Sequence, residues 1–217
     1  MTRALLFQGV KLLTLLSFPL LSWAEATLPP LLQEVEEKYA KSPTLQADFT
    51  QINQVAAMKT QKVSSGILMV KRPNKLRWET LKPDTSLLVS DGKKFWFYTP
   101  PFDEGDRGQV IVKNSAEISS RITNALLSGK FSMAKDMKMS QRGEKQFTLI
   151  PKKGRAGSVE KIILEIDPEQ KLIQKISLFH KNGDQSEIQL THIEFEKPLK
   201  EELFRFTAPP NTDQISP

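Results

Sequence analysis

Residues 87–98 read LLVSDGKKFWFY, two apolar runs on either side of a turn sequence. Asp91-Gly92 lies in that turn. An Asp-Gly pair between apolar runs is a strong hairpin signal, because glycine accepts the positive φ that a two-residue turn requires. Such a turn would pair Leu88 with Phe95 and Leu87 with Trp96, and either pair could line a cavity. The stretch therefore predicts an antiparallel β-hairpin.

Both faces of this hairpin are apolar. A sheet with one solvated face alternates apolar and polar residues, but residues 87–89 and 95–98 do not alternate, and neither do residues 67–70. A second layer must therefore cover the other face. Either helices pack on it to form a closed core, or the sheet is curved and its concave side stays apolar and open to a ligand. The pattern alone leaves both readings open.

Strand patterns recur along the chain, with short turn-like connections between many of them. They are expected over residues 45–50, 66–71, 75–80, 86–90, 93–98, 146–150, 159–166, 172–180 and 187–195. Connections this short cannot form a parallel crossover, so consecutive strands must run antiparallel. The fold class is therefore predicted to be mainly β, an antiparallel meander in one domain.

Two amphipathic helices are expected beside the sheet. Residues 31–41 follow Pro29-Pro30 and carry apolar residues at helical spacing. In mid-chain, Asn114-x-x-Glu117 resembles a capping box, and Gly129 is a natural helix stop. The apolar positions of this second helix are Ile118, Ile122 and Leu126.

The N-terminus has the layout of an export signal. A basic start precedes the apolar run 12–21, which is shorter than the roughly 20 residues that a membrane-spanning helix needs. Small-x-small sites follow, so cleavage is expected after Ala24 or Ala26. Residues 1–24 are therefore predicted to be a removable signal peptide, and residues 25–217 a single domain.

Composition limits the function classes. The chain has no cysteine, which in an exported protein excludes disulfides, a thiol nucleophile and the lipidated cysteine of a lipoprotein. Its 31 Lys and Arg exceed its 25 Asp and Glu, but the basic residues are interspersed with acidic ones, so no nucleic-acid partner is expected. We expect an untethered monomer.

The sequence carries no catalytic motif. The two histidines, His180 and His192, fall on neighbouring predicted strands with no acidic pair at a suggestive spacing. There is no glycine-rich phosphate loop and no nucleophile elbow. Residues 103–106 are acidic but lack the alternating ladder of a calcium loop. We expect no enzyme activity, no cofactor and no metal site.

One charged residue ends an apolar stripe. Leu68 and Val70 share a strand face whose next member is Arg72. After the turn, Leu76 and Trp78 resume the apolar alternation. Arg72 is either a strand-end charge that reaches water or a guanidinium held over an apolar interior. In the second reading, its natural acceptors are the carbonyls at the C-terminal end of a covering helix.

Several of these motifs together resemble one family. Lys71-Arg72-Pro73-Asn74 with Trp78 and Pro83, and residues 88–93 followed by Trp96-Phe97-Tyr98, are similar to the periplasmic outer-membrane lipoprotein carriers of the LolA family. The ending 204–210 resembles the last strand of that family. The resemblance spans nearly the whole chain after the predicted signal peptide.

The resemblance implies an incomplete antiparallel β-barrel closed by α-helices over an apolar cavity. It implies that Arg72 is a latch that hydrogen-bonds the backbone of the helical lid when no cargo is bound. The implied cargo is a triacylated lipoprotein, received in the periplasm from an inner-membrane transporter of the LolCDE type and passed to an outer-membrane receptor of the LolB type. With the strand pattern, it makes these residues cavity candidates: Leu68, Val70, Leu76, Trp78, Leu88, Phe95 and Phe97.

A second function stays open at this point. A periplasmic regulatory module that senses lipid or lipoprotein could use the same half-barrel.

Overall fold

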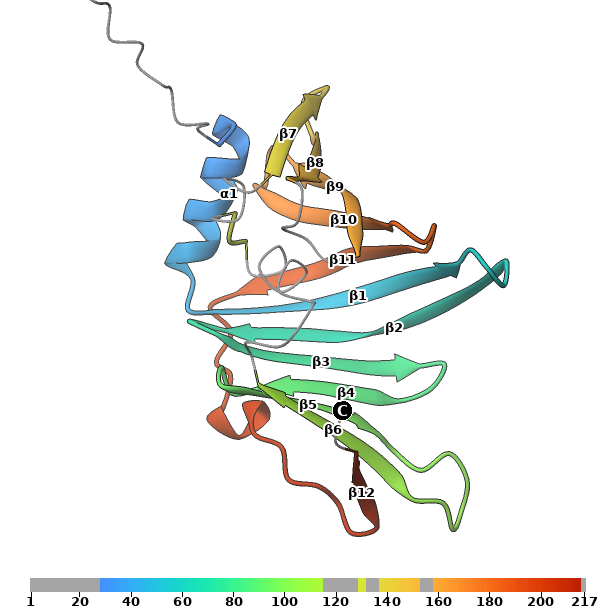
Figure 1. The fold of residues 1–217 in the computed structure, drawn as a ribbon. Helices are drawn as coiled ribbons and strands as arrows, with labels where there is room; N and C mark the ends of the chain where they lie inside the picture. Colours follow the sequence, from blue (N-terminus) through green and yellow to red (C-terminus); the bar gives the residue numbers. More distant parts are fainter. Residues whose placement is uncertain (1–27, 115–128, 132–136, 153–157, 216–217) are drawn as a thin grey trace, which may run out of the picture.

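The computed structural model describes residues 28–114, 129–131, 137–152 and 158–215. Within them the chain forms one α-helix, α1 (Pro30–Lys41), one 3₁₀-helix (Glu201–Phe204) and one β-sheet (Figure 1). The predicted signal peptide and the predicted mid-chain helix with Ile118, Ile122 and Leu126 lie outside the described residues.

The sheet has twelve strands in the described part of the chain. They are β1 (Thr44–Val55), β2 (Thr60–Lys71), β3 (Lys75–Lys82), β4 (Ser86–Ser90), β5 (Lys94–Thr99), β6 (Gly108–Asn114), β7 (Met137–Arg142), β8 (Gln146–Pro151), β9 (Val159–Asp167), β10 (Leu172–His180), β11 (Gln185–Phe195) and β12 (Thr212–Ile215).

The strand order is β12-β6-β5-β4-β3-β2-β1-β11-β10-β9-β8-β7. Two antiparallel meanders, β2 to β6 and β7 to β11, meet on the two sides of β1. The predicted mainly β, antiparallel fold is thus confirmed for β1 to β11. β12 is the exception, because it pairs in parallel with β6. β6 and β7 follow each other along the chain but lie toward opposite edges of the open sheet.

Helix α1 begins at a proline and covers the sheet with one face. Pro30 stands in the first turn, where a missing N–H costs nothing. Leu32, Val35 and Tyr39 are fully buried, and Lys38 and Lys41 lie in the last turn, where a positive charge favours the helix dipole. The apolar face joins the core formed by the strands, as the spacing of residues 31–41 predicts.

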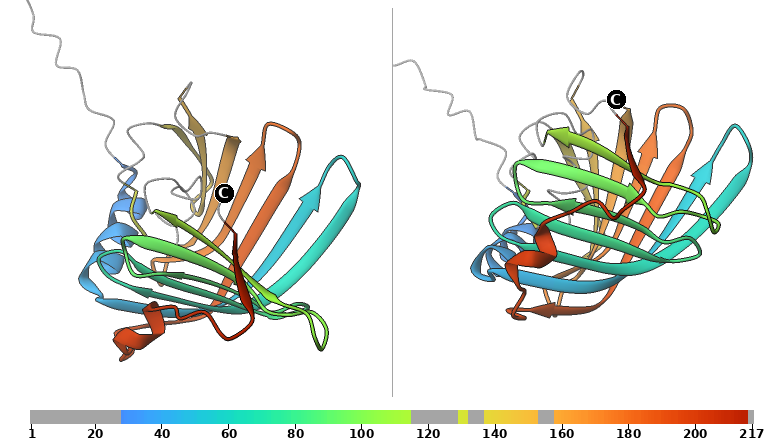
Figure 2. Two further views of the ribbon diagram at one scale, coloured as in Figure 1. Left: turned by 60° about the horizontal axis from the view of Figure 1, so that its bottom comes forward. Right: turned by 90° about the horizontal axis from the view of Figure 1, so that it is seen from below.

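A glycine allows the sheet to bend between β2 and β3. A Cβ on Gly66 would lie 1.9 Å from the carbonyl oxygen of Glu79 and 2.9 Å from the Cα of Thr80. The β2–β3 register also shifts between Ser65 and Gly66. Bulges and strand glycines mark points where a sheet bends or another backbone approaches closely. Figure 2 shows the resulting curved sheet, with a concave and a convex side.

The C-terminal segment covers the convex side of β3 to β6. Leu199 and Phe204 are buried, and the ring of Phe206 packs on Tyr98 with centroids 5.3 Å apart. Arg77 Nη1 donates to the Leu203 carbonyl (3.3 Å). Figure 2 shows this segment running across the strands. The apolar residues on the convex face are therefore covered by the C-terminal segment, which in its described residues includes the 3₁₀-helix Glu201–Phe204 but no α-helix.

Two details of the prediction are wrong. Leu88 pairs with Phe97, and Phe95 pairs with Ser90, instead of Leu88 with Phe95. The reason is a wider turn: Asp91 Oδ1 accepts the backbone N–H of both following lysines at 2.8 Å, a side-chain turn that the Asp-Gly signal does not distinguish. The ending 204–210 does not form the last strand: it continues from the last residue of the 3₁₀-helix as irregular chain, and the last strand is β12.

Glu201 fastens the C-terminal segment to the convex side. Its carboxylate pairs with Lys71 Nζ at 2.7 Å and also with Lys75 Nζ, and Lys71 donates to the Leu199 carbonyl (2.8 Å) as well. Hydrogen bonds from Lys71 and Lys75 lower the pKa of Glu201 to about 2. The contact joins the segment to β2 and β3.

Substitution of Gly66 by alanine should destabilise the fold. The new Cβ meets backbone, which cannot rotate away, so we expect the free energy of unfolding to fall by about 3 kcal/mol or more, at the upper end of overpacking effects. Urea unfolding measures this. Ser65→Ala, on the neighbouring residue, should change stability by less than about 0.5 kcal/mol. Equal stabilities of the two variants would contradict the close approach.

Glu201 should make stability depend on pH in acid. Its folded pKa of about 2 lies below the ordinary 4.5, so the stabilisation is fully present above pH 4.5 and is lost as the pH falls through 2. Thermal unfolding of wild type and Glu201→Gln should differ at neutral pH and converge over this window. Glu202→Gln, on the adjacent residue, should keep the wild-type profile. A difference that persists at pH 2 would exclude the ion pairs as its cause.

Candidate functional site

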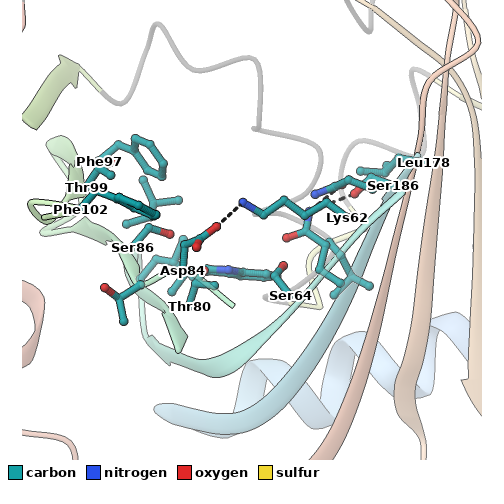
Figure 3. A pocket seen from close by; sticks show the side chains of 17 residues that line it. Lys62, Ser64, Thr80, Asp84, Ser86, Phe97, Thr99, Phe102, Leu178 and Ser186 are labelled. Carbon is teal, nitrogen blue, oxygen red and sulfur yellow. Dashed lines mark hydrogen bonds and ion pairs between the residues drawn. The ribbon is translucent and has the colours of Figure 1, made fainter. Parts of the chain in front are cut away.

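A cavity of about 640 Å³ lies on the concave side of the sheet, at the strand ends remote from α1 (Figure 3). Its walls come from both meanders, because β1 joins them. The apolar residues that line it are Leu76, Trp78, Leu88, Phe97, Phe102, Leu178 and Ile188. The remaining lining residues are polar. Those at the strand ends remote from α1 are called the mouth, and they are Gln51, Asn53, Lys62, Asp84 and Ser186. The strands with two apolar faces allowed two interpretations, a closed core or a concave apolar surface open to a ligand. The cavity corresponds to the second.

Four of the seven predicted cavity candidates line this cavity, and three do not. Leu76, Trp78, Leu88 and Phe97 lie on its wall, and Phe97 is 43% exposed. Leu68, Val70 and Phe95 are on the same face of the sheet but are buried in the core that includes α1, at 0%, 5% and 8% exposure. The concave face thus continues under the helix.

Sequence reasoning missed the opposite wall of the cavity. Leu178 of β10 and Ile188 of β11 line it, and Trp78 packs on Phe49 of β1 with ring centroids 4.0 Å apart. The alternation in residues 172–180 and 187–195 gives each strand an apolar face. It does not say that these faces turn toward β3, which depends on the pairing of β1 with β11.

Arg72 is held at the C-terminal end of α1. Its Nε donates to the carbonyl of Ser42, the residue that caps the helix, at 2.7 Å, and its backbone N–H donates to the Pro43 carbonyl at 2.9 Å. A helix-end carbonyl is the acceptor expected of an arginine kept over an apolar interior. The contact joins the β2–β3 turn to the covering helix.

Burial shapes the electrostatics around Arg72. Burial lowers the pKa of its guanidinium, and the hydroxyl of nearby Tyr39 opposes that shift. Burial also raises the pKa of Tyr39 to about 12, although its oxygen accepts the backbone N–H of Ile173 at 3.1 Å. A charge partly removed from water needs hydrogen-bond acceptors, and the Ser42 carbonyl is one.

A third chain segment, residues 129–131, meets the helix and the turn here. Lys130 Nζ donates to the Pro73 carbonyl (3.0 Å), and the Phe131 N–H donates to Glu36 Oε1 (3.0 Å). Gly129 has φ +67° and lies so close to the Tyr39 ring that a Cβ would be 2.4 Å from it. The segment that follows the predicted mid-chain helix is therefore packed against α1.

The described residues contain no group of three or more His, Asp and Glu side chains that could hold a metal ion. His180 Nδ1 lies 3.1 Å from Ser158 Oγ, and His192 Nδ1 lies 2.9 Å from Asp48 Oδ2, both on exposed surface. In the same part of the chain, no helix is long and apolar enough to cross a membrane.

The buried hydroxyl of Tyr39 should contribute to stability. Tyr39→Phe leaves the Ile173 N–H without its acceptor, so the free energy of unfolding should fall by about 1–3 kcal/mol. The matched control is Tyr98→Phe: Tyr98 is the other tyrosine of the chain, and its hydroxyl has no hydrogen-bond partner among the described residues. Chemical denaturation of both variants makes the comparison. Equal effects would contradict the role of the Tyr39 hydroxyl.

Comparison with known proteins places this chain in a family. Residues 40–207 match the profile of the outer membrane lipoprotein carrier protein LolA. The outer-membrane lipoprotein carrier protein of Dechloromonas aromatica is 29% identical over 201 residues, which are 91% of this chain and 90% of the relative. That of Psychromonas ingrahamii is 32% identical over 180 residues, 82% of this chain and 83% of the relative.

A solved structure shares the fold. The crystal structure of an uncharacterized conserved protein from Thermus thermophilus matches with a TM-score of 0.50 and 12% identity, over 85% of this chain and 97% of that one. This structural similarity shows the fold alone, whereas the sequence matches show the family. The chain belongs to the LolA family of outer-membrane lipoprotein carrier proteins, which are transport proteins and not enzymes.

Proposed function

We propose that this protein carries lipoproteins through the periplasm by burying their acyl chains in the concave cavity. It receives triacylated lipoproteins from an inner-membrane transporter of the LolCDE type and passes them to an outer-membrane receptor of the LolB type. The carrier works as a monomer after removal of residues 1–24, with cleavage after Ala24 or Ala26. The observation that carries the proposal is the apolar concave cavity in a chain of this family.

The energetics of acyl chains support this role. Each buried CH₂ contributes about 0.8 kcal/mol, so a lipoprotein cannot leave a membrane unless a carrier offers competing apolar area. The cavity of about 640 Å³ has the size of a site for one drug-sized ligand, in the usual range of about 300–1,000 Å³. Three acyl chains require more surface. Leu68, Val70 and Phe95, buried on the same face, would supply it when the helical cover moves away.

In this proposal the barrel is incomplete and closed by helices, and Arg72 is the latch. The helical cover consists of α1 and the mid-chain helix with Ile118, Ile122 and Leu126. The bond from Arg72 Nε to the Ser42 carbonyl supports this role, because it joins the β2–β3 turn to the end of α1. Cargo that displaces α1 must break it, so the latch lowers cargo affinity and favours release. No nucleotide is needed for hand-over.

Removing the latch should separate loading from release. We expect Arg72→Leu to accept lipoprotein from the inner-membrane transporter but to transfer it to the receptor at least several-fold more slowly, because the closed state is no longer favoured. A transfer assay with purified receptor measures this. Arg142→Leu, on the exposed β7–β8 hairpin, should behave as wild type. Normal transfer by Arg72→Leu would refute the latch.

The cargo itself can be identified directly. Native mass spectrometry of the protein purified from the periplasm should show a bound triacylated lipoprotein. Free lipid as the sole bound species would favour the sensing module instead, and no bound acyl chain in any preparation would contradict the carrier.

A further inference from the structure

On β3 to β5, the concave face changes from apolar to polar residues between one cross-strand row and the next. Trp78, Leu88 and Phe97 form one cross-strand row on β3, β4 and β5, since Leu88 pairs with both of the others. Two residues farther from α1, the next row is Thr80, Ser86 and Thr99. An apolar row is thus followed directly by a row of three hydroxyl groups, which we call the hydroxyl row. Figure 3 shows the hydroxyl row on the wall of the cavity.

Beyond the hydroxyl row, the polar groups of the mouth already bind one another. Lys62 Nζ and Asp84 Oδ2 form an ion pair at 2.7 Å. Gln51 Nε2 donates to Asn53 Oδ1 at 3.1 Å and to Ser186 Oγ at 3.0 Å. The cationic residue of the lining is therefore neutralised by a carboxylate.

Unlike the polar groups of the mouth, the hydroxyl groups of the row can still hydrogen-bond to a ligand. Among the described residues, no protein group hydrogen-bonds to the side-chain oxygen of Thr80, Ser86 or Thr99. Each hydroxyl can donate one hydrogen bond. Three donors therefore face the cavity where the apolar row of β3 to β5 ends, whereas Ile188 and Leu178 on the opposite wall lie farther from α1.

We propose that the hydroxyl row binds the ester carbonyls of a diacylglyceryl group. The ligand would extend its acyl chains toward Trp78 and α1, and its polar remainder would leave past the Lys62–Asp84 pair. The inference rests on the proposed carrier function and adds the orientation of the cargo and the residues that recognise its glyceryl group.

The chemistry of the row favours neutral esters over other amphiphiles. An ester carbonyl only accepts hydrogen bonds, and burying it without a donor is unfavourable. Hydroxyl groups at the apolar boundary supply that donor. A free fatty acid would bring a carboxylate, which requires a cation, and Lys62 is already paired with Asp84. Ester groups of this kind occur in lipoproteins and in phospholipids, so the ligand's source must be tested separately.

The test compares two ligands on matched variants. The first ligand is a synthetic N-palmitoyl-S-dipalmitoylglyceryl cysteine peptide, and the second is the same peptide with both ester linkages replaced by ethers. The variants Thr80→Val, Ser86→Ala and Thr99→Val remove one hydroxyl each with little change of shape. Thr191→Val, on β11 outside the cavity lining, is the control. Isothermal titration calorimetry in detergent below its critical micelle concentration measures the dissociation constants.

Each cavity variant should bind the ester ligand about three- to tenfold more weakly than wild type, the effect of one lost hydrogen bond. The ether ligand should bind wild type and variants equally. Equal losses for both ligands, or no loss for either, would overturn the hydroxyl row and leave the carrier function standing. Failure of wild type to bind the ester ligand would overturn the carrier function itself.

The source of the ester is resolved by competition. Dipalmitoyl phosphatidylglycerol at equal concentration should displace little of the ester lipopeptide if lipoproteins are the cargo. Full displacement of the lipopeptide would show that the hydroxyl row binds phospholipid and would contradict lipoprotein as its ligand.

Discussion

The strands from β3 to β5 carry apolar side chains on both faces, and the rest of the fold covers much of the convex face and part of the concave face. On the convex side, the C-terminal segment does this, fastened by Glu201 to Lys71 and Lys75 and by the Leu203 carbonyl to Arg77. On the concave side, α1 covers the end of the sheet nearest to it. Farther from α1, the concave surface lines the cavity.

Arg72 lies where the covering layer meets the sheet. Three segments remote in sequence come together there: the end of α1, the β2–β3 turn and residues 129–131. Among the described residues, these contacts include hydrogen bonds to the carbonyls of Ser42, Pro43 and Pro73, and a typical hydrogen bond contributes about 1 kcal/mol net. Such a junction can hold a cover closed and still open at a modest cost in free energy, which suits a carrier that must both bind and release.

Local sequence patterns predicted most strands and α1, whereas the composition of the cavity wall depends on pairing between strands remote in sequence. Alternation and turn residues identified nine strands and α1, whereas the break in the stripe at Arg72 left two interpretations, one of which names a helix-end acceptor. The register at Asp91 was wrong because a side-chain turn and a two-residue turn share the same sequence signal. The wall formed by β10 and β11 could not be predicted, since it depends on the β1–β11 pairing and on the bend at Gly66. β12 has four residues and an exposed surface, so no periodicity marks it.

Two tryptophans on opposite faces of the sheet can show whether acyl chains enter its concave side. Trp78 lines the cavity, whereas Trp96 pairs with Val89 and faces the convex side; Trp23 belongs to the predicted signal peptide. A lipopeptide brominated at its chain ends should quench the fluorescence of Trp78 in Trp96→Phe and leave Trp96 unquenched in Trp78→Phe. Quenching of Trp96 with Trp78 unaffected would show that the acyl chains bind elsewhere and would contradict their entry into the concave cavity.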